Sequence, residues 1–259
     1  MSNSILMFGA FCFGLCIGSF LNVCISRMPL GNSIVTPGSR CPVCGKAIRF
    51  YDNIPVISFL LLRARCRTCA TRISIRYPAV ELLTGAMAVF VILKYGFNLP
   101  ALIYFLFIAS LLVITFIDID HQIIPDRISL AGIVAGLALS FLLPEISFTE
   151  SIIGALAGGG SLFAVAMTYY LITGKEGMGG GDIKLLAMIG AFTGWQGVIF
   201  TVFAASATGT VIGLILMAAK GRNLKFAVPF GPFLSFGAVV YLFFGQALIH
   251  WYLFGISPY

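Results

Sequence analysis

Met178-Gly179-Gly180-Gly181-Asp182 interrupts a nearly continuous apolar sequence with three glycines followed by a carboxylate. Glycine allows a positive backbone φ and the close approach of another chain, so this run predicts a tight turn and not a helix interior. The apolar residues 183–192 follow it and predict a helix that begins at Asp182. An Asp at a helix start can simply cap free amides at the positive end of the helix dipole. The carboxylate therefore has a structural explanation as well as a catalytic one.

The composition around this stretch predicts an all-α polytopic membrane protein, because 59% of the 259 residues are hydrophobic and 10% are charged. Apolar stretches of about 20 residues predict eight transmembrane helices. The first is interpreted as a retained helix, because its basic residues follow it and do not precede it. The sixth is short, and the sequence leaves open whether it crosses fully. The eight predicted spans are residues 5–25, 79–97, 100–117, 125–143, 151–173, 183–194, 195–219 and 229–254.

The distribution of Lys and Arg predicts the orientation in the membrane. If the loop after the first helix is cytoplasmic, it holds nine of the 16 basic residues, and six more fall on the same side. Only Lys94 falls outside, and both termini are then extracytoplasmic. We therefore interpret the net charge of +7 as a topology signal that also favours contact with an anionic lipid bilayer, and not as nucleic-acid binding.

A second acidic stretch, Ile117-Asp118-Ile119-Asp120-His121, ends the third predicted helix. Asp118 is the first ionisable residue after the apolar stretch, so we expect it to face the helix bundle, where such a residue indicates function. The predicted topology places it on the same membrane face as Asp182. Two alternatives stay open for these acids: a solvated loop, or a divalent cation bound by the Asp-x-Asp-His cluster.

Two aspartates held together at the edge of a low-dielectric region cannot both ionise easily, so Asp118 and Asp182 are predicted to share a proton. One carboxylate could then act as a base on water while the other polarises a peptide carbonyl, as in aspartic proteases. Gly179 and Gly181 would let an extended substrate backbone approach the pair. No G-x-S-x-G or H-E-x-x-H motif offers a competing catalytic group.

Two CxxC motifs lie in the loop after the first helix, Cys41-Pro-Val-Cys44 and Cys66-Arg-Thr-Cys69. Four thiolates at this spacing predict a tetrahedral zinc site in preference to free thiols or a redox pair. Because all four ligands are protein sulfurs, no coordination position is open and the metal is predicted to be structural.

Seven stretches, in order along nearly the whole chain, resemble the type IV prepilin peptidases, a family of prepilin leader peptidases and N-methyltransferases. The Gly-x-Gly-Asp pattern is also similar to the signature of presenilin-type intramembrane proteases. The seven stretches are Gly18-Ser-Phe-Leu-Asn-Val23, Ser39-Arg-Cys-Pro-Val-Cys44, Tyr51-Asp-Asn-Ile-Pro-Val56, Ile75-Arg-Tyr-Pro-Ala-Val-Glu-Leu-Leu-Thr-Gly85, residues 118–126, Gly179-Gly-Gly-Asp182 and Pro229-Phe-Gly-Pro232.

The resemblance implies that Asp118 and Asp182 are the catalytic aspartates and that the four cysteines hold zinc. It further implies a protein of the bacterial inner membrane that cuts the leader of prepilins or pseudopilins, for type IV pili or type II secretion, on the cytoplasmic side after a glycine. The new amino terminus, usually phenylalanine, would then be methylated with S-adenosylmethionine as donor. This chain departs from the family at Ala64, where a glycine is common.

These inferences predict a division into a first transmembrane helix (1–25), a cytoplasmic zinc subdomain associated with methyl transfer (26–78) and a transmembrane peptidase domain (79–259). Two other functions stay open. The buried acids could relay ions in a transporter or an assembly scaffold whose zinc loop docks a partner. A metal-dependent enzyme could instead act on lipid-linked phosphates through Asp118, Asp120 and Asp126. The sequence predicts neither the residues that bind the methyl donor nor the oligomeric state.

Overall fold

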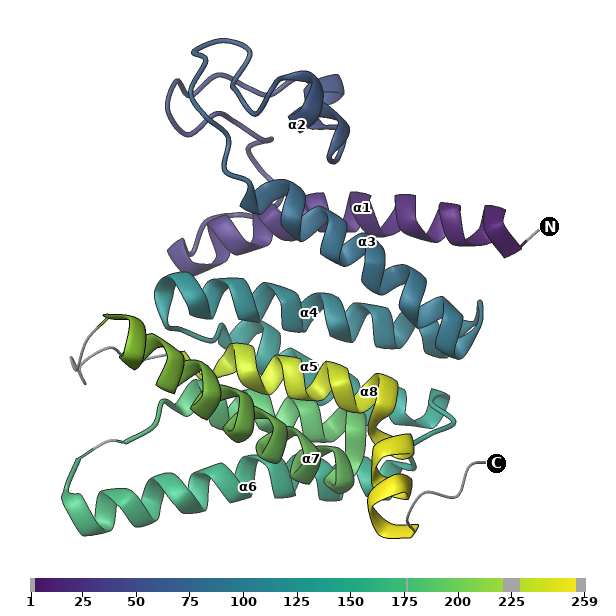
Figure 1. The fold of residues 1–259 in the computed structure, drawn as a ribbon, viewed down its shortest axis with the longest axis vertical. Helices are drawn as coiled ribbons and strands as arrows, with labels where there is room; N and C mark the ends of the chain where they lie inside the picture. The colour runs from purple at the N-terminus through teal and green to yellow at the C-terminus, as the bar shows by residue number, and fades with distance from the viewer. Residues whose placement is uncertain (1–2, 176, 221–228, 255–259) are drawn as a thin grey trace. The chain divides into compact units, whose positions relative to one another are not determined.

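The chain folds into helices, with a loop-rich segment at residues 31–75, as Figure 1 shows for the computed structural model, which describes residues 3–175, 177–220 and 229–254. The all-α prediction is confirmed, because in these ranges the only extended pairing consists of two isolated β-bridges. The helices are α1 (Asn3–Arg27), α2 (Ile57–Leu61), α3 (Arg76–Tyr95), α4 (Leu99–His121), α5 (Asp126–Leu139), α6 (Phe148–Thr173), α7 (Gly180–Lys220) and α8 (Gly231–Phe254), with 3-10 turns η1 (Met28–Leu30), η2 (Phe50–Asn53) and η3 (Ser140–Leu142).

The predicted count of eight transmembrane helices is not confirmed. Within the described residues, five helices are long and apolar enough to cross a membrane, namely α1, α3, α4, α6 and α7. Helix α5 has 14 residues and gives way to η3 at Ser140, which is short of the roughly 20 residues that a crossing needs. Helix α7 bends at Gly194, where φ is 70° and ψ is −178°. The bend falls at the predicted boundary between the sixth and seventh spans.

The chain divides into two compact units, Met1–Val113 and Ile114–Tyr259, and the boundary falls within α4. In the first unit α1 packs along α3 through a Gly-x-x-x-Gly face. A Cβ atom on Gly14 would lie 2.7 Å from the Gly85 Cα atom, and one on Gly18 would lie 2.6 Å from the Glu81 Cα atom. Only glycine at these positions permits such close backbone contact.

In the second unit α7 packs against α5, α6 and α8. Helix α6 contacts α7 through a small-residue face: a Cβ atom on Gly154 would lie 2.2 Å from the Gly190 carbonyl oxygen, and one on Gly158 would lie 2.3 Å from the Leu186 carbonyl oxygen. Ser151 adds a buried hydrogen bond of 2.6 Å to the Ala191 carbonyl. The similar Gly209-xxx-Gly213 pattern on α7 makes no such contact, since nothing lies within 4 Å of a Cβ atom on Gly213.

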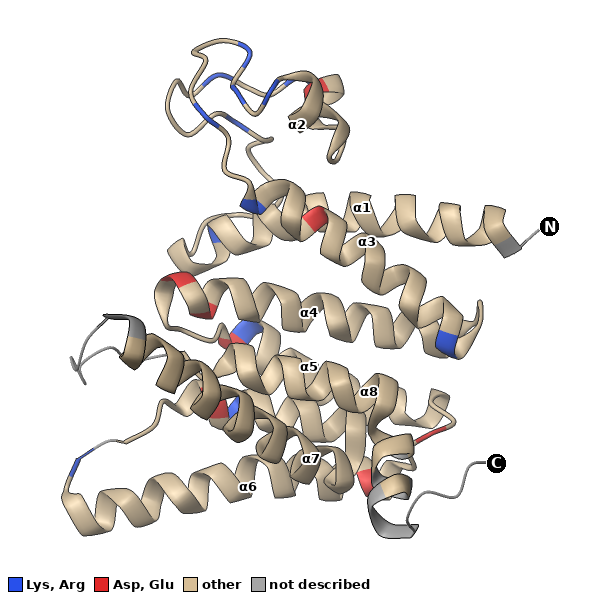
Figure 2. Cartoon of the chain, in the orientation of Figure 1, with Lys and Arg blue, Asp and Glu red and all other residues tan. Residues whose placement is uncertain are grey.

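Figure 2 shows Lys and Arg gathered on the loops around α2, which is the charge pattern behind the predicted orientation. Two basic residues that entered that prediction, Arg222 and Lys225, lie outside the described residues. The cytoplasmic orientation of this loop and the three-part functional division stay predictions.

Candidate functional site

The four cysteines come together in the first unit, as predicted. Their sulfur atoms all lie within 4.8 Å of one another, and the Cys41 and Cys69 sulfurs are 3.8 Å apart. Zinc bonded tetrahedrally to sulfur at about 2.3 Å sets the sulfur atoms about 3.8 Å apart. The donor set and its geometry therefore fit a zinc ion, held by Cys41, Cys44, Cys66 and Cys69. Among the described residues no other group of three or more His, Cys, Asp or Glu side chains is gathered in this way.

The two halves of this site are the same local structure, repeated 25 residues apart in the sequence. The first Cys of each half accepts a hydrogen bond from the residue after the second Cys, Gly45 or Ala70, at 2.9 Å in both halves. An antiparallel bridge closes each half, Arg40 with Ala47 and Arg65 with Arg72. The equivalent residues 39–48 and 64–73 share Arg, two Cys and Ile in register. The metal site thus consists of two similar knuckles.

The knuckles differ at the residue that follows the second Cys. Gly45 has φ 67° and Ala70 has φ 55°, so both adopt the left-handed conformation. This conformation costs an L-residue other than glycine roughly 1–2 kcal/mol. A Cβ atom on Gly45 would meet nothing within 4 Å, so only the backbone conformation distinguishes the two positions.

We expect Ala70→Gly to tighten zinc binding and Gly45→Ala to weaken it, each by about 1 kcal/mol, or roughly fivefold in the zinc dissociation constant. The reason is that glycine adopts the left-handed conformation without a steric penalty. Competition with a chromophoric chelator on the purified protein measures both constants. Changes in the same direction for the two variants would contradict the matched-knuckle geometry.

Backbone amides surround the sulfur atoms and favour thiolates. The Cys44 and Val43 amides lower the pKa of the Cys41 thiol to about 6, and the Cys69 and Thr68 amides lower the pKa of Cys66. The Thr71 amide also lowers the pKa of Cys69, but burial and the neighbouring thiols outweigh it and raise that pKa to about 11. A metal cation would stabilise all four sulfurs as thiolates, which is the form that binds a metal.

At Ala64, where the resemblance leads us to expect a glycine, the backbone is left-handed. Arg63 has φ 50° and Ala64 has φ 57°, so the chain makes two successive left-handed residues just before the second knuckle. Glycine suits such a position because it has no Cβ atom. The common glycine is thus explained by backbone conformation, and the alanine keeps the same turn in this chain.

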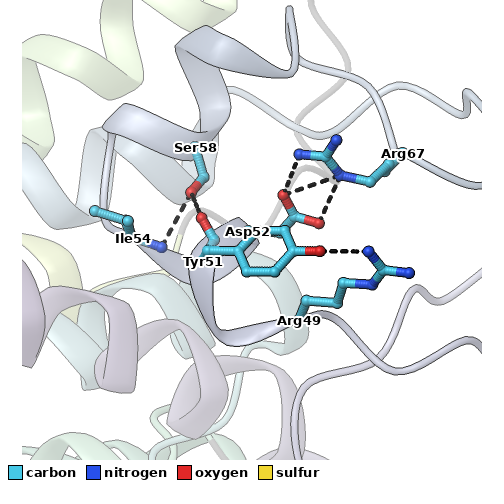
Figure 3. Close-up of polar contacts among 6 residues, drawn as sticks. All are labelled: Arg49, Tyr51, Asp52, Ile54, Ser58 and Arg67. Atoms are coloured by element: carbon cyan, nitrogen blue, oxygen red, sulfur yellow. Dashed lines mark hydrogen bonds and ion pairs between the residues drawn. The ribbon is translucent and has the colours of Figure 1, made fainter.

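A polar network fixes the second knuckle to η2 (Figure 3). The Arg67 guanidinium, between two zinc ligands in sequence, donates to both Asp52 oxygens at 2.6–3.1 Å and thereby lowers the pKa of Asp52. Arg49 donates to the Tyr51 hydroxyl, and the Ser58 hydroxyl donates to the Tyr51 carbonyl at 2.9 Å. None of these residues was predicted from the sequence to have a role.

The two aspartates come together in the second unit. Asp118 lies in the last turn of α4 and is 5% exposed, while Asp182 lies half-buried in the first turn of α7. The two are close enough that the charge of Asp118 acts on Asp182. The first turn of α7 is one of the two positions, cap or first turn, that the sequence allowed for Asp182. The tight turn predicted for the three glycines is not formed, because α7 already begins at Gly180 and none of the three glycines has a positive φ.

Helix α8 supplies a contact that the sequence analysis did not assign. The Gly231 amide donates to Asp118 Oδ2 at 3.0 Å, and a Cβ atom on Gly231 would lie 2.6 Å from that oxygen. The adjacent Pro232 suits the first turn of a helix because it needs no amide partner there. The sequence feature that could have indicated this contact is the Phe230-Gly231-Pro232 turn before an apolar stretch.

The glycines before Asp182 have different surroundings. A Cβ atom on Gly181 would lie 2.9 Å from the Ile124 Cβ atom, and Ile124 also lies against Gly231. Nothing lies within 4 Å of a Cβ atom on Gly179. Gly181 therefore permits the start of α7 to approach the Asp118 region, and Gly179 has no such packing role.

An ion pair holds the starts of α5 and α7 together beside the aspartates. Lys184 Nζ lies 2.7 Å from Asp126 Oδ1 and 2.8 Å from Oδ2. Asp126 is thus engaged by a lysine, and the acids 118–126 do not form a gathered metal-binding group in the part of the chain that the structure describes. This arrangement does not favour the divalent-cation alternative.

The fold and these two sites define a class: a multi-pass helical membrane protein with a buried pair of aspartates and a separate four-cysteine metal site. Two family models match the chain, the Bacterial Peptidase A24 N-terminal domain at residues 12–95 and the Type IV leader peptidase family at residues 105–214. The chain belongs to the type IV leader peptidase family.

Curated relatives agree with this assignment. The chain is similar to proteins named prepilin leader peptidase/N-methyltransferase from Myxococcus xanthus, at 43% identity over 83% of this chain and 65% of that protein, and from Pseudomonas putida, at 36% over 91% and 89%. The protein of the same name from Aeromonas hydrophila is 36% identical over 94% of this chain and 92% of its own length. No solved structure gives a significant match.

Proposed function

We propose that this protein is a membrane aspartic endopeptidase that removes the leader of prepilins and then N-methylates the new amino terminus. The observation that carries the proposal is the buried Asp118 beside Asp182 in a chain of this family. The names of the relatives supply the substrate class and the second activity. Pseudopilins are included because they present the same kind of leader.

In the proposed cleavage the two carboxylates share one proton. The Gly231 amide holds Asp118 Oδ2, so we assign the other oxygen of Asp118 to the attacking water. The ionised carboxylate removes a proton from the water, and the protonated carboxyl of the other aspartate donates a hydrogen bond to the scissile carbonyl. The proton then passes to the leaving amine, which restores the pair.

We further propose that the site faces the cytoplasm of a bacterial inner membrane, because most basic residues fall on that side. Residues 26–78 form the zinc subdomain associated with methyl transfer, and residues 79–259 carry the peptidase. Zinc would hold the subdomain together, with a cysteine sulfur at each of its four coordination positions. S-adenosylmethionine would supply the methyl group.

We expect Gly181→Ala to lower leader cleavage by roughly ten- to a hundredfold, the scale of a misplacement of about 1 Å in an active site. The added Cβ atom meets Ile124 and pushes the start of α7 away from Asp118. Gly180→Ala is the matched control, since nothing lies within 4 Å of a Cβ atom on Gly180 and no substrate contact is predicted for it. The measurement is the initial rate of leader removal by purified enzyme in detergent. Equal rates for the two variants would contradict the proposed role of Gly181.

The test of the whole proposal is mass spectrometry of a pilin precursor co-expressed with this protein. We expect a mature chain that lacks its leader and carries one methyl group on its amino terminus. An uncut precursor would refute the peptidase assignment. A cut but unmethylated product would refute the methyltransferase half alone. A transporter or scaffold predicts no processing, and a lipid-phosphate enzyme predicts activity that needs magnesium.

A further inference from the structure

A cavity of about 860 Å³ lies in the first unit between the zinc knuckles and the neighbouring ends of α1 and α3. Its volume falls within the roughly 300–1,000 Å³ of small-molecule sites. Cys41 and Cys66 form part of its wall, so the shape of the cavity depends on the metal site. The aspartate pair belongs to the other unit and does not line this cavity.

Glu81 is a buried carboxylate in this cavity that nothing above has used. It is 8% exposed, and its Oε2 atom accepts a hydrogen bond of 2.7 Å from the Val56 amide. The Ser19 side chain is its other partner, and both partners are neutral. A carboxylate offers about four acceptor positions, so two bonds leave capacity for a ligand.

The charges of the cavity single out Glu81. Six Lys and Arg residues line the cavity, whereas only two acidic residues do, Asp52 and Glu81. Asp52 is engaged by the Arg67 guanidinium. Glu81 has no cationic partner among the described residues, and a buried carboxylate without one is costly. A cationic ligand entering the cavity would therefore find its partner at Glu81.

The structure holds this carboxylate in place from three directions. Gly18 lets the α1 backbone lie against the Glu81 Cα atom. Val56, whose amide bonds Glu81, has φ 60°, which is a strained value for a β-branched residue. Asn22 of α1 donates to the Tyr77 carbonyl at 3.0 Å, one turn before Glu81 on α3. Strain of this kind persists where surrounding contacts enforce it, and it is common at functional sites.

We propose that this cavity is the methyl-transfer site and that Glu81 binds the amino group of the methyl acceptor. The inference rests on the proposed function and assigns its second activity to a site. Glu81 lies in the second turn of α3, near the start of a candidate membrane span, where the amino terminus of a membrane-anchored product can reach it. The size of the cavity also fits a nucleoside-sized methyl donor.

In the transfer, the amine nitrogen forms a bond to the methyl carbon while the carbon–sulfur bond of the sulfonium donor breaks and its electron pair goes to sulfur. The nitrogen must be neutral to attack, so the proton that it loses passes to the Glu81 carboxylate. The net products are a methylated ammonium group, a thioether and one proton, which Glu81 releases to solvent.

The experiment uses the purified full-length protein, tritium-labelled S-adenosylmethionine and a peptide with a free amino-terminal phenylalanine. We expect Glu81→Gln to reduce methyl transfer about a hundredfold, the scale of lost proton transfer. It should also weaken binding of the peptide at least tenfold in equilibrium dialysis. Leader cleavage and binding of S-adenosylmethionine should stay within twofold of wild type, because glutamine keeps an oxygen for the Val56 amide.

Glu150→Gln is the matched control, because Glu150 lies in the other unit and Gln also serves the capping box in which it takes part. It should leave all four measurements unchanged. Wild-type methyl transfer in Glu81→Gln would overturn the inference. Loss of donor binding with intact peptide binding would also overturn it, because Glu81 would then serve the donor.

A second measurement needs no variant and guards against misfolding of Glu81→Gln. A peptide that carries a photoreactive phenylalanine analogue at its amino terminus is cross-linked to the wild-type protein. We expect the adducts at cavity residues such as Ser19, Val56 or Tyr77, and adducts confined to residues 114–259 would overturn the inference. If the wild-type protein cleaves a precursor but never methylates it, the methyltransferase half of the proposed function fails, and this inference fails with it.

Discussion

Asp118→Asn and Asp182→Asn are each expected to reduce leader cleavage by about a thousandfold or more, while the protein still folds and inserts. Asparagine has nearly the same shape as aspartate but can neither take a proton from water nor share one, and positioned proton transfer contributes roughly 10²–10⁴-fold. In Asp118→Asn, the asparagine oxygen can still accept the hydrogen bond from the Gly231 amide. The measurement is the rate of leader removal from a purified precursor, followed by mass spectrometry.

Asp120→Asn is the matched control for this pair. Asp120 is two residues from Asp118 but exposed, and we expect its variant to cleave within about twofold of wild type, as for most surface substitutions. A metal-dependent reaction through Asp118, Asp120 and Asp126 predicts a large loss in the control as well. Full processing by either single aspartate variant would refute the proposed pair.

Cys66→Ser is expected to release the zinc and reduce methyl transfer at least a hundredfold, while leader cleavage stays within about twofold. A serine hydroxyl does not replace a thiolate at a structural zinc site, and the metal contributes much of the folding free energy of such small subdomains. Without it, the cavity wall that Cys41 and Cys66 form loses its shape. Zinc content is measured by atomic emission on the purified protein, beside both activities.

The control for this prediction is Cys16→Ser, because Cys16 is an exposed residue of α1 and is not one of the four ligands. Its zinc content and both activities should equal those of wild type. Normal methyl transfer by a zinc-free Cys66→Ser protein would contradict a structural role of the metal in this activity. Loss of cleavage in that protein would show that the two units do not act independently.

The zinc site could be predicted almost completely from the sequence, because its information is local. Each CxxC motif places two sulfur atoms on one tight turn, and only the pairing of two such turns is a tertiary event. The left-handed residues at Ala64 and Ala70 could not be predicted, because alanine gives no signal for a positive φ. The similarity of residues 39–48 to residues 64–73 is visible in the sequence. Only the matching hydrogen bonds show that the two segments have the same local structure.

The aspartate pair required more than local pattern. Hydropathy and charge predicted that Asp118 and Asp182 lie on one face of the membrane, and the structure brings them within electrostatic reach. The Gly231 amide on Asp118 depends on where α8 packs, and the contact of Ile124 with Gly181 depends on the loop before α5; hydrophobic periodicity predicts neither contact. The count of eight spans is not confirmed, because α5 has only 14 helical residues.

The sequence by itself determined the membrane-helical class, the two cysteine motifs and the choice of Asp118 and Asp182 as the candidate pair. These follow from hydrophobicity, residue spacing and the cost of a charge in an apolar region, and each of these properties acts over a few residues along the chain. Only the tertiary structure decided which backbone amide meets Asp118, which glycines carry helix contacts, and that Glu81 lies in a cavity beside the zinc knuckles. Such contacts join residues that are distant in sequence, so their free energy depends on packing that local pattern does not encode.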